Sequence, residues 1–255
     1  MADESGQSRG TNQGRTLERA LDVLECVGES RQPMSLTQIS RSTGLHVATT
    51  QRLIRTLVRR DYLTASTLGY SLGPRVLAHA HSFVLQDRLT RVSQKVLTDL
   101  TAATSLTSSV FVRSGGERIL IARVEAPDPL SYYFPVGQKL PLRVGGGKVL
   151  LAYLDEEDRG ELLAAEEDTV LADGRMQTVE QLERDLESVR ADGYFISTSE
   201  RHTGTVSITA PVWGPEGELL AAINLVAHHG TLDAEGMSAH RTTLMQASRL
   251  ITSQV

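Results

Sequence analysis

Residues 35–60 read SLTQISRSTGLHVATTQRLIRTLVRR, a pattern of two helices joined by a tight turn. Ser35 and Gln38 fit a capping box, in which each side chain binds the backbone of the other residue, so a short helix is expected from Leu36. Gly44 can end that helix in a left-handed conformation, which most other residues adopt only with strain. A longer helix follows, and the segment is therefore predicted to be a helix-turn-helix.

The longer helix has two chemically different faces. Leu53, Ile54 and Leu57 recur at the spacing of one buried stripe, whereas Arg52 and Arg55 lie on the opposite face beside hydroxyl groups. A polar face of this kind can enter the major groove of DNA, where arginine recognises guanine edges or phosphates. The same residues would also suit a solvated basic face on an ordinary helical hairpin.

The residues that follow and precede this segment favour the first interpretation. Residues 61–64 and 70–72 alternate like strands around the turn formers at 66–69, and a hairpin directly after a recognition helix is a wing. A first helix is expected at 17–27. Residues 15–74 are therefore predicted to form a winged helix-turn-helix domain. Residues 1–14 contain almost nothing apolar and are expected to be a disordered arm.

With these motifs in view, the chain resembles the IclR family of transcriptional regulators. The likeness is carried by residues 16–24, 36–43, 49–53 and 70–73, and it continues to about residue 230. It implies a ligand-responsive regulator, here expected to be a repressor, that acts as a dimer or tetramer and reads a palindromic double-stranded DNA operator. The residues expected to contact DNA are Ser35, Thr37, His46, Ala48, Thr49, Gln51, Arg52 and Arg55.

Charge is segregated along the chain of 255 residues, whose net charge is -5. Residues 1–80 hold ten Lys and Arg against seven Asp and Glu, a balance of +3; residues 81–255 hold sixteen against twenty-four, a balance of -8. DNA binding depends on the local charge, so the acidic total does not exclude it. One cysteine excludes an internal disulfide framework, and no apolar run approaches a membrane span, so a cytoplasmic protein is expected.

The second part of the chain has the rhythm of an α+β domain. A linker helix is expected at 75–88, and residues 89–255 are expected to form an antiparallel sheet flanked by helices, which the resemblance identifies as GAF-like and effector-binding. The strands are expected at 108–113, 119–124, 130–136, 194–198, 205–212 and 219–227. The helices are expected at 89–103, 148–154, 156–165 and 179–191.

The second domain contains no pattern of catalytic residues. Gly147 and Lys148 suggest a phosphate-binding loop, but that motif requires glycine where Leu142 stands and a hydroxyl residue where Val149 stands. What remains is a glycine-rich helix start whose free amides can hold a carboxylate. No Ser/His/Asp set or metal-ligand cluster is found, so no enzyme and no cofactor are expected.

Two alternatives differ in class from a ligand-responsive regulator. One is an enzyme acting on a small metabolite in the second domain, with the winged domain serving as an interaction module. The other is a constitutive architectural DNA binder, which does not explain why most of the chain is an acidic, sensor-like domain.

The resemblance also implies where an effector would bind. Contacts are expected from the glycine loop and from inward positions on the last strands, with two further side chains at the mouth. A hydroxyl residue of some relatives is replaced by Val226. Such a pocket would suit a small carboxylate with an apolar or aromatic body. The residues implied are Gly146, Gly147, Ser197, Ser207 and Asn224, with Tyr133 and Arg143 at the mouth.

Overall fold

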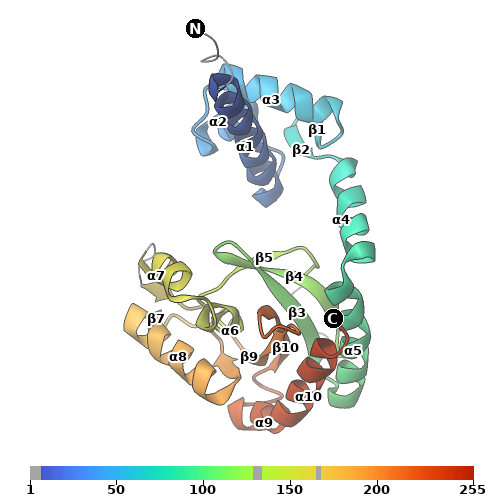
Figure 1. Ribbon diagram of the computed structural model, residues 1–255, viewed down its shortest axis with the longest axis vertical. Coiled ribbons are helices and arrows are strands. Elements are labelled where there is room, and N and C mark those ends of the chain that lie inside the picture. The colour runs from blue at the N-terminus through green and yellow to red at the C-terminus, as the bar shows by residue number, and fades with distance from the viewer. Residues whose placement is uncertain (1–6, 129–133, 165–167) are drawn as a thin grey trace. The chain divides into compact units, whose positions relative to one another are not determined.

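The computed structural model describes residues 7–128, 134–164 and 168–255. The chain forms two compact units, Met1–Gln86 and Asp87–Val255 (Figure 1). Sequence reasoning placed a separate linker helix between the two domains. The structure instead groups this helix with the first unit, because residues at its start are hydrogen-bonded to the segment before the wing: the Arg75 amide donates to the Asp61 carbonyl at 3.2 Å.

The first unit is a winged helix-turn-helix domain, as its sequence predicts. The capping box is present: the Gln38 amide donates to Ser35 Oγ at 3.3 Å, and the Ser35 amide donates to Gln38 Oε1 at 2.8 Å. Gly44 follows the first motif helix with φ of 66°. The elements are α1 (Gln7–Glu29), α2 (Leu36–Ser42), α3 (Val47–Arg59), β1 (Leu63–Ser66), β2 (Gly69–Leu72) and α4 (Pro74–Gln86).

The prediction of a disordered arm over residues 1–14 is wrong from Gln7 onward, where α1 already begins. Helix propagation adds one hydrogen bond for each residue that is ordered, so a helix nucleated by its packed part can extend into a polar segment. The same effect lengthens the helix expected at 17–27 to Glu29 at its other end.

A small core made by α1, α2, α3 and β1 holds the first unit together. Its buried residues are Val23, Val27, Ile39, Leu53, Ile54 and Leu63. The wing is joined to the segment before α2 by a bridge between Met34 and Tyr70, whose two backbone hydrogen bonds measure 2.9 and 2.8 Å. Only glycine fits at position 69, because a Cβ on Gly69 would lie 2.6 Å from the Met34 carbonyl oxygen.

Replacing Ile54 by alanine is expected to destabilise the first unit by about 2–5 kcal/mol. Ile54 is 1% exposed, and a core this small cannot refill the space that the substitution leaves. Urea unfolding followed by circular dichroism measures the effect. Val47→Ala is the matched control, since Val47 lies on the same helix and is 50% exposed. Equal unfolding midpoints for the two variants would contradict the assigned core.

The second unit is built on a six-stranded antiparallel sheet in the order β5-β4-β3-β10-β9-β8. Its strands are β3 (Thr107–Ser114), β4 (Glu117–Val124), β5 (Lys139–Pro141), β8 (Phe195–Thr198), β9 (Thr205–Trp213) and β10 (Leu219–His228), with a separate ribbon of β6 (Thr169–Val170) and β7 (Met176–Gln177). Its helices are α5 (Arg88–Thr104), α6 (Gly147–Ala152), α7 (Glu156–Ala164), α8 (Val179–Asp192), α9 (Ala234–Ala239) and α10 (Arg241–Thr252).

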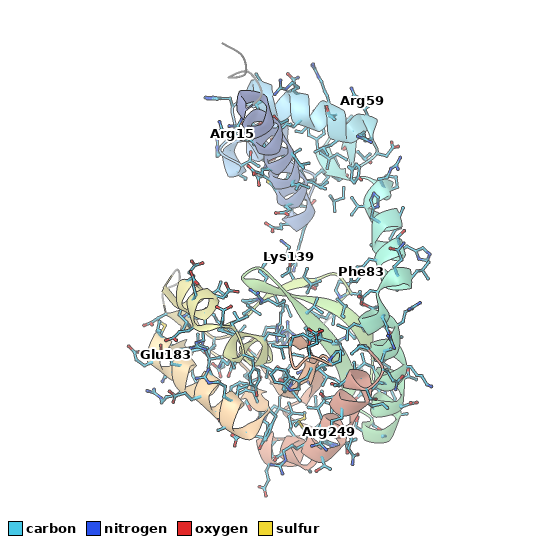
Figure 2. The ribbon with its side chains drawn as sticks, in the orientation of Figure 1. Arg15, Arg59, Phe83, Lys139, Glu183 and Arg249 are labelled. Carbon is cyan, nitrogen blue, oxygen red and sulfur yellow. The ribbon has the colours of Figure 1, made fainter. Side chains whose placement is uncertain are left out.

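Helices cover both faces of this sheet, as the α+β prediction requires (Figure 1). On one face α5 and α10 pack Leu97 and Leu244 against strand residues such as Ile208. On the other face α6 and α8 pack Leu150 and Leu186 against the sheet. Side chains fill the space between the sheet and its helices, whereas Arg249 on α10 and Glu183 on α8 point outward (Figure 2).

Three parts of the second unit differ from the sequence-based expectation. The extended run expected at 130–136 lies partly outside the described residues, and the strand observed near it is β5. The β6–β7 ribbon was not expected. The C-terminal helices α9 and α10 were also missed, although Leu244, Ala247 and Ile251 of α10 recur at helical spacing and are buried. Among the helices of the described ranges, none has the length and apolarity needed to cross a membrane.

Candidate functional sites

The eight residues expected to contact DNA gather at the N-terminal parts of α2 and α3. Arg52 and Arg55 are exposed, and α3 carries no acidic residue, so this face is basic. Arg59 also points outward near the C-terminal end of α3 (Figure 2). Ser35 Oγ is already engaged in the capping box. Ser35, Thr37, His46 and Ala48 are likewise exposed, and Thr49 and Gln51 are partly buried.

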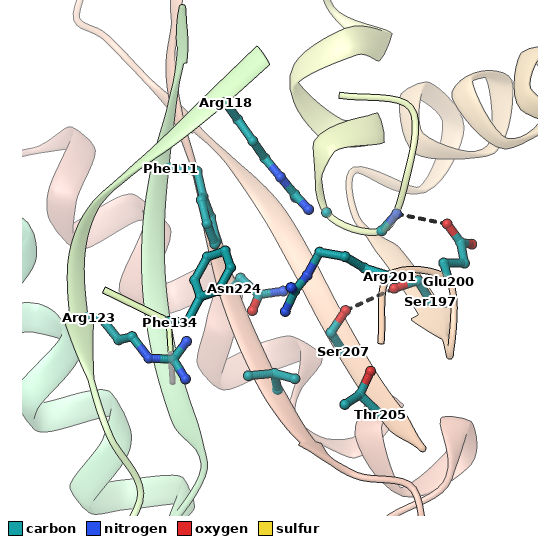
Figure 3. Close-up of a pocket in the computed structure, with 13 residues that line it drawn as sticks. Phe111, Arg118, Arg123, Phe134, Ser197, Glu200, Arg201, Thr205, Ser207 and Asn224 are labelled. Carbon is teal, nitrogen blue, oxygen red and sulfur yellow. Dashed lines mark hydrogen bonds between the residues drawn. The ribbon is translucent and has the colours of Figure 1, made fainter. Parts of the chain in front are cut away.

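A pocket opens on the α6 and α8 side of the sheet in the second unit (Figure 3). It encloses about 40 Å³, room for about three water molecules. Arg201 reaches into this space from the loop after β8 (Figure 3). A larger ligand therefore requires side chains such as Arg201 to move. The lining residues are Phe111, Arg118, Arg123, Phe134, Gly145, Gly146, Ser197, Glu200, Arg201, Thr205, Ser207, Asn224 and Val226.

Two neighbouring rows of residues across the sheet supply the polar floor of the pocket. In one row Ser197 pairs with Ser207, which pairs with Val226, and the two hydroxyl oxygens lie 2.9 Å apart. In the next row Asn224 donates to Thr209 Oγ1 at 2.8 Å. Because residues two apart on a strand share a face, the three strands β8, β9 and β10 bring these side chains together.

A β-bulge brings two arginines of β4 to the same pocket. Phe111 pairs with Leu120 and Val110 pairs with Ala122, so β4 carries one extra residue at this point. Arg118 and Arg123 are an odd number of residues apart and would otherwise lie on opposite faces of the sheet. Both are mostly buried, and Arg123 forms an ion pair with Glu125 while donating to Ser109 Oγ at 3.2 Å.

The glycine loop before α6 forms another wall of the pocket. Gly145 has φ of 57°, and its amide donates to Glu200 Oε2 at 2.7 Å. A Cβ on Gly146 would lie 2.4 Å from Thr209 Oγ1 and 3.0 Å from Arg118 Nη1, so only glycine fits. Arg118 donates to the Val144 carbonyl at 3.2 Å and so braces the loop from the sheet.

The pocket combines positive charge with aromatic rings. The guanidinium of Arg118 lies 4.8 Å from the ring centre of Phe111, and that of Arg201 lies 4.5 Å from the ring centre of Phe134. With Arg123, three arginines line the pocket against one carboxylate, Glu200. This arrangement favours an anion with an aromatic or apolar body.

Seven residues are expected to bind an effector. Four of them line the pocket: Gly146, Ser197, Ser207 and Asn224. Gly147 is instead the first residue of α6, where a Cβ would lie 2.4 Å from the Leu142 carbonyl oxygen. Arg143 is 4% exposed and is not among the described residues that line the pocket; its carbonyl accepts a 3.0 Å hydrogen bond from buried Gln177. Tyr133 lies outside the described residues.

Sequence reasoning missed the residues that give the pocket its charge and its apolar wall. Arg123 had a local signal, because it is a lone cation within the apolar strand run ILIARV. Glu200 and Arg201 also had a signal, because they belong to the dense ionisable cluster at residues 200–202, which is interpreted from sequence as a loop salt bridge. The other residues missed carry no comparable signal; they are Phe111, Arg118, Phe134 and Thr205.

A winged helix-turn-helix unit followed by a pocketed α+β unit defines a DNA-binding transcriptional regulator. Residues 16–66 match the IclR helix-turn-helix domain, and residues 81–253 match the bacterial transcriptional regulator IclR C-terminal domain. The chain belongs to the IclR family of DNA-binding transcriptional regulators.

Three similar proteins illustrate the relationship. The p-hydroxybenzoate hydroxylase transcriptional activator of Acinetobacter baylyi is 31% identical, over 83% of this chain and 80% of that protein. An IclR-family transcriptional regulator from Brucella abortus has the same fold, with a TM-score of 0.80 and 21% identity over 94% and 92% of the two chains. The inducer-binding domain of a PobR double mutant from Acinetobacter, in complex with 3-hydroxybenzoic acid, is 28% identical with a TM-score of 0.58, over 65% and 98%.

These relatives are transcriptional regulators and not enzymes, so the enzyme alternative is set aside. Within the described ranges, no group of three or more His, Cys, Asp or Glu side chains could hold a metal ion.

Proposed function

We propose that this regulator is a repressor whose affinity for a palindromic operator changes when a small aromatic carboxylate binds in the pocket. The observation that carries the ligand class is the placement of three arginines and two phenylalanine rings around a floor of hydroxyl and amide groups. A guanidinium pairs well with a carboxylate, and an aromatic body can stack on a phenylalanine ring.

The charges of the pocket favour a single carboxylate. Glu200 is already ion-paired with Lys148 Nζ and accepts the Gly145 amide, both at 2.7 Å, and Arg123 has Glu125 as its partner. Among the described residues, these neighbours and Asp185 bring three carboxylates close to the four cations Arg118, Arg123, Lys148 and Arg201. Ser207 and Asn224 offer hydrogen bonds to a ring hydroxyl. The relative bound to 3-hydroxybenzoic acid supports this class of ligand.

The DNA-binding half of the proposal rests on the basic face of α3. Two winged units in a dimer, or in each dimer of a tetramer, would place two α3 helices in successive major grooves of a palindrome. Linkage then requires that a ligand which weakens DNA binding is itself bound more weakly in the presence of DNA, typically by about 1–3 kcal/mol.

A titration of DNA binding tests the proposal. The purified protein is mixed with its own upstream intergenic region, and binding is followed by fluorescence anisotropy with and without benzoate, 3-hydroxybenzoate and 4-hydroxybenzoate. We expect at least one acid to weaken specific binding by roughly 5- to 150-fold. Benzamide is the uncharged control and should have no effect. Tighter binding with an acid would reject release of the operator by the ligand, and equal effects of benzamide would reject the carboxylate.

A further inference from the structure

Lys148 follows the three glycines of the pocket loop and has no role in a phosphate-binding motif. The Lys148 side chain is 1% exposed. Among the fully buried side chains of the described residues, it is the largest. Its Nζ lies 2.7 Å from Asp185 Oδ2 on α8 and 2.7 Å from Glu200 Oε2 after β8. It also lies 4.7 Å from the ring centre of Phe195. Lys148 does not line the ligand pocket.

The two carboxylates that hold Lys148 have different surroundings. The side chain of Asp185 is 36% exposed, so water screens its attraction to Lys148. The side chain of Glu200 is only 9% exposed, and removing its cationic partner would leave a largely buried charge without compensation. The pair with Glu200 therefore carries the stronger constraint.

The oxygen of Glu200 that binds Lys148 also binds the glycine loop. Glu200 Oε2 accepts the Gly145 amide at 2.7 Å, and Gly145 holds the left-handed conformation that turns the chain into α6. A hydrogen bond to an ionised acceptor is stronger than one between neutral groups, so the charge on Glu200 determines how firmly the loop is held. Lys148 stabilises that charge.

We propose that Lys148 is a positioning residue of the effector pocket. By pairing with Glu200 it keeps the Gly145–Gly146 backbone in place against Arg118 and Thr209, without contacting the ligand. This inference rests on the proposed function for its consequence in ligand binding. Its effect on the loop is independent of any ligand.

Hydrogen exchange in the full-length protein tests this role with three variants: Lys148→Met, Glu200→Gln and the control Asp185→Asn, which removes the other partner of Lys148. Mass spectrometry follows peptides that cover residues 142–148. For Lys148→Met and Glu200→Gln we expect amide exchange in this loop to rise by about tenfold to a hundredfold. For Asp185→Asn we expect less than about threefold.

Equal acceleration in Asp185→Asn and Glu200→Gln, or unchanged exchange in Glu200→Gln, would overturn the positioning role. Unchanged loop exchange in folded Lys148→Met would overturn it as well. If Lys148→Met does not fold, Lys148→Gln, which removes the charge and keeps a polar side chain, takes its place. Binding of 4-hydroxybenzoate, measured in parallel by calorimetry, should weaken about tenfold or more in Lys148→Met. The unsubstituted protein could bind no 4-hydroxybenzoate while the variants still show the expected loop exchange. That result would reject the proposed class of ligand and would leave the positioning role of Lys148 supported.

Discussion

Replacing Arg52 by alanine is expected to reduce affinity for the specific operator by a factor on the order of 10² to 10⁴. A good bidentate contact between arginine and guanine contributes about 1–3 kcal/mol, and a dimer would lose one such contact in each half-site. Arg52 is exposed on the basic face of α3, next to the buried Leu53 that anchors the helix. Anisotropy titration with operator DNA at fixed salt measures the change.

The control is Arg249→Ala, which removes the same charge from an exposed position on α10 in the second unit (Figure 2). It should leave operator affinity within about twofold, because long-range effects of exposed charges are screened. Circular dichroism should show both variants folded. Unchanged operator affinity in folded Arg52→Ala would reject α3 as the recognition helix.

Replacing Gly146 by alanine is expected to remove the response to aromatic acids while leaving DNA binding intact. The added Cβ would meet Thr209 Oγ1 at 2.4 Å, and Thr209 is fully buried and bonded to Asn224. Since Thr209 cannot give way easily, the loop must shift and take the pocket wall with it. We expect Gly146→Ala to bind a benzoate more weakly than the unsubstituted protein does, by a factor on the order of 10 to 100.

Calorimetry with the acid that gives the response in the unsubstituted protein measures this loss. Gly160→Ala is the control, because a Cβ at Gly160 on α7 has nothing within 4 Å. Operator binding without ligand should be the same in all three proteins. A Gly146→Ala protein that binds the acid normally would show that the glycine loop does not form the ligand site.

The winged domain could be predicted from sequence because its signals are local. The Ser35–Gln38 capping box, the turn at Gly44 and the stripe of Leu53 and Ile54 each involve residues within one or two helical turns. The longer strands of the second unit, β3, β4, β8, β9 and β10, were likewise predictable from apolar runs along each segment, whereas β5 and the β6–β7 ribbon were not. The predicted disordered arm at residues 1–14 differs from the structure for a local reason as well. Helix α1 extends beyond Thr16 toward the N-terminus, and no apolar residue in that stretch marks the extension.

The ligand pocket could be predicted only in part. The family resemblance implies Ser197, Ser207 and Asn224, and strand pairing brings these three side chains to one pocket. Arg143 was expected at the pocket mouth because of its position in the loop, but its burial beside Gln177 is a property of the packed structure. Lys148 suggested a phosphate loop, whereas its partners Asp185 and Glu200 come from segments far away in the chain.

The sequence by itself therefore determined the two domains, the DNA-reading helix and the membership of the regulator family. Tertiary structure alone decided the charge of the pocket. The single extra residue in β4 turns Arg118 and Arg123 to the same face, and the loop after β8 adds Arg201 and Glu200. The physical reason is that strand register and loop packing depend on contacts between distant segments, which the periodicity of one segment cannot encode.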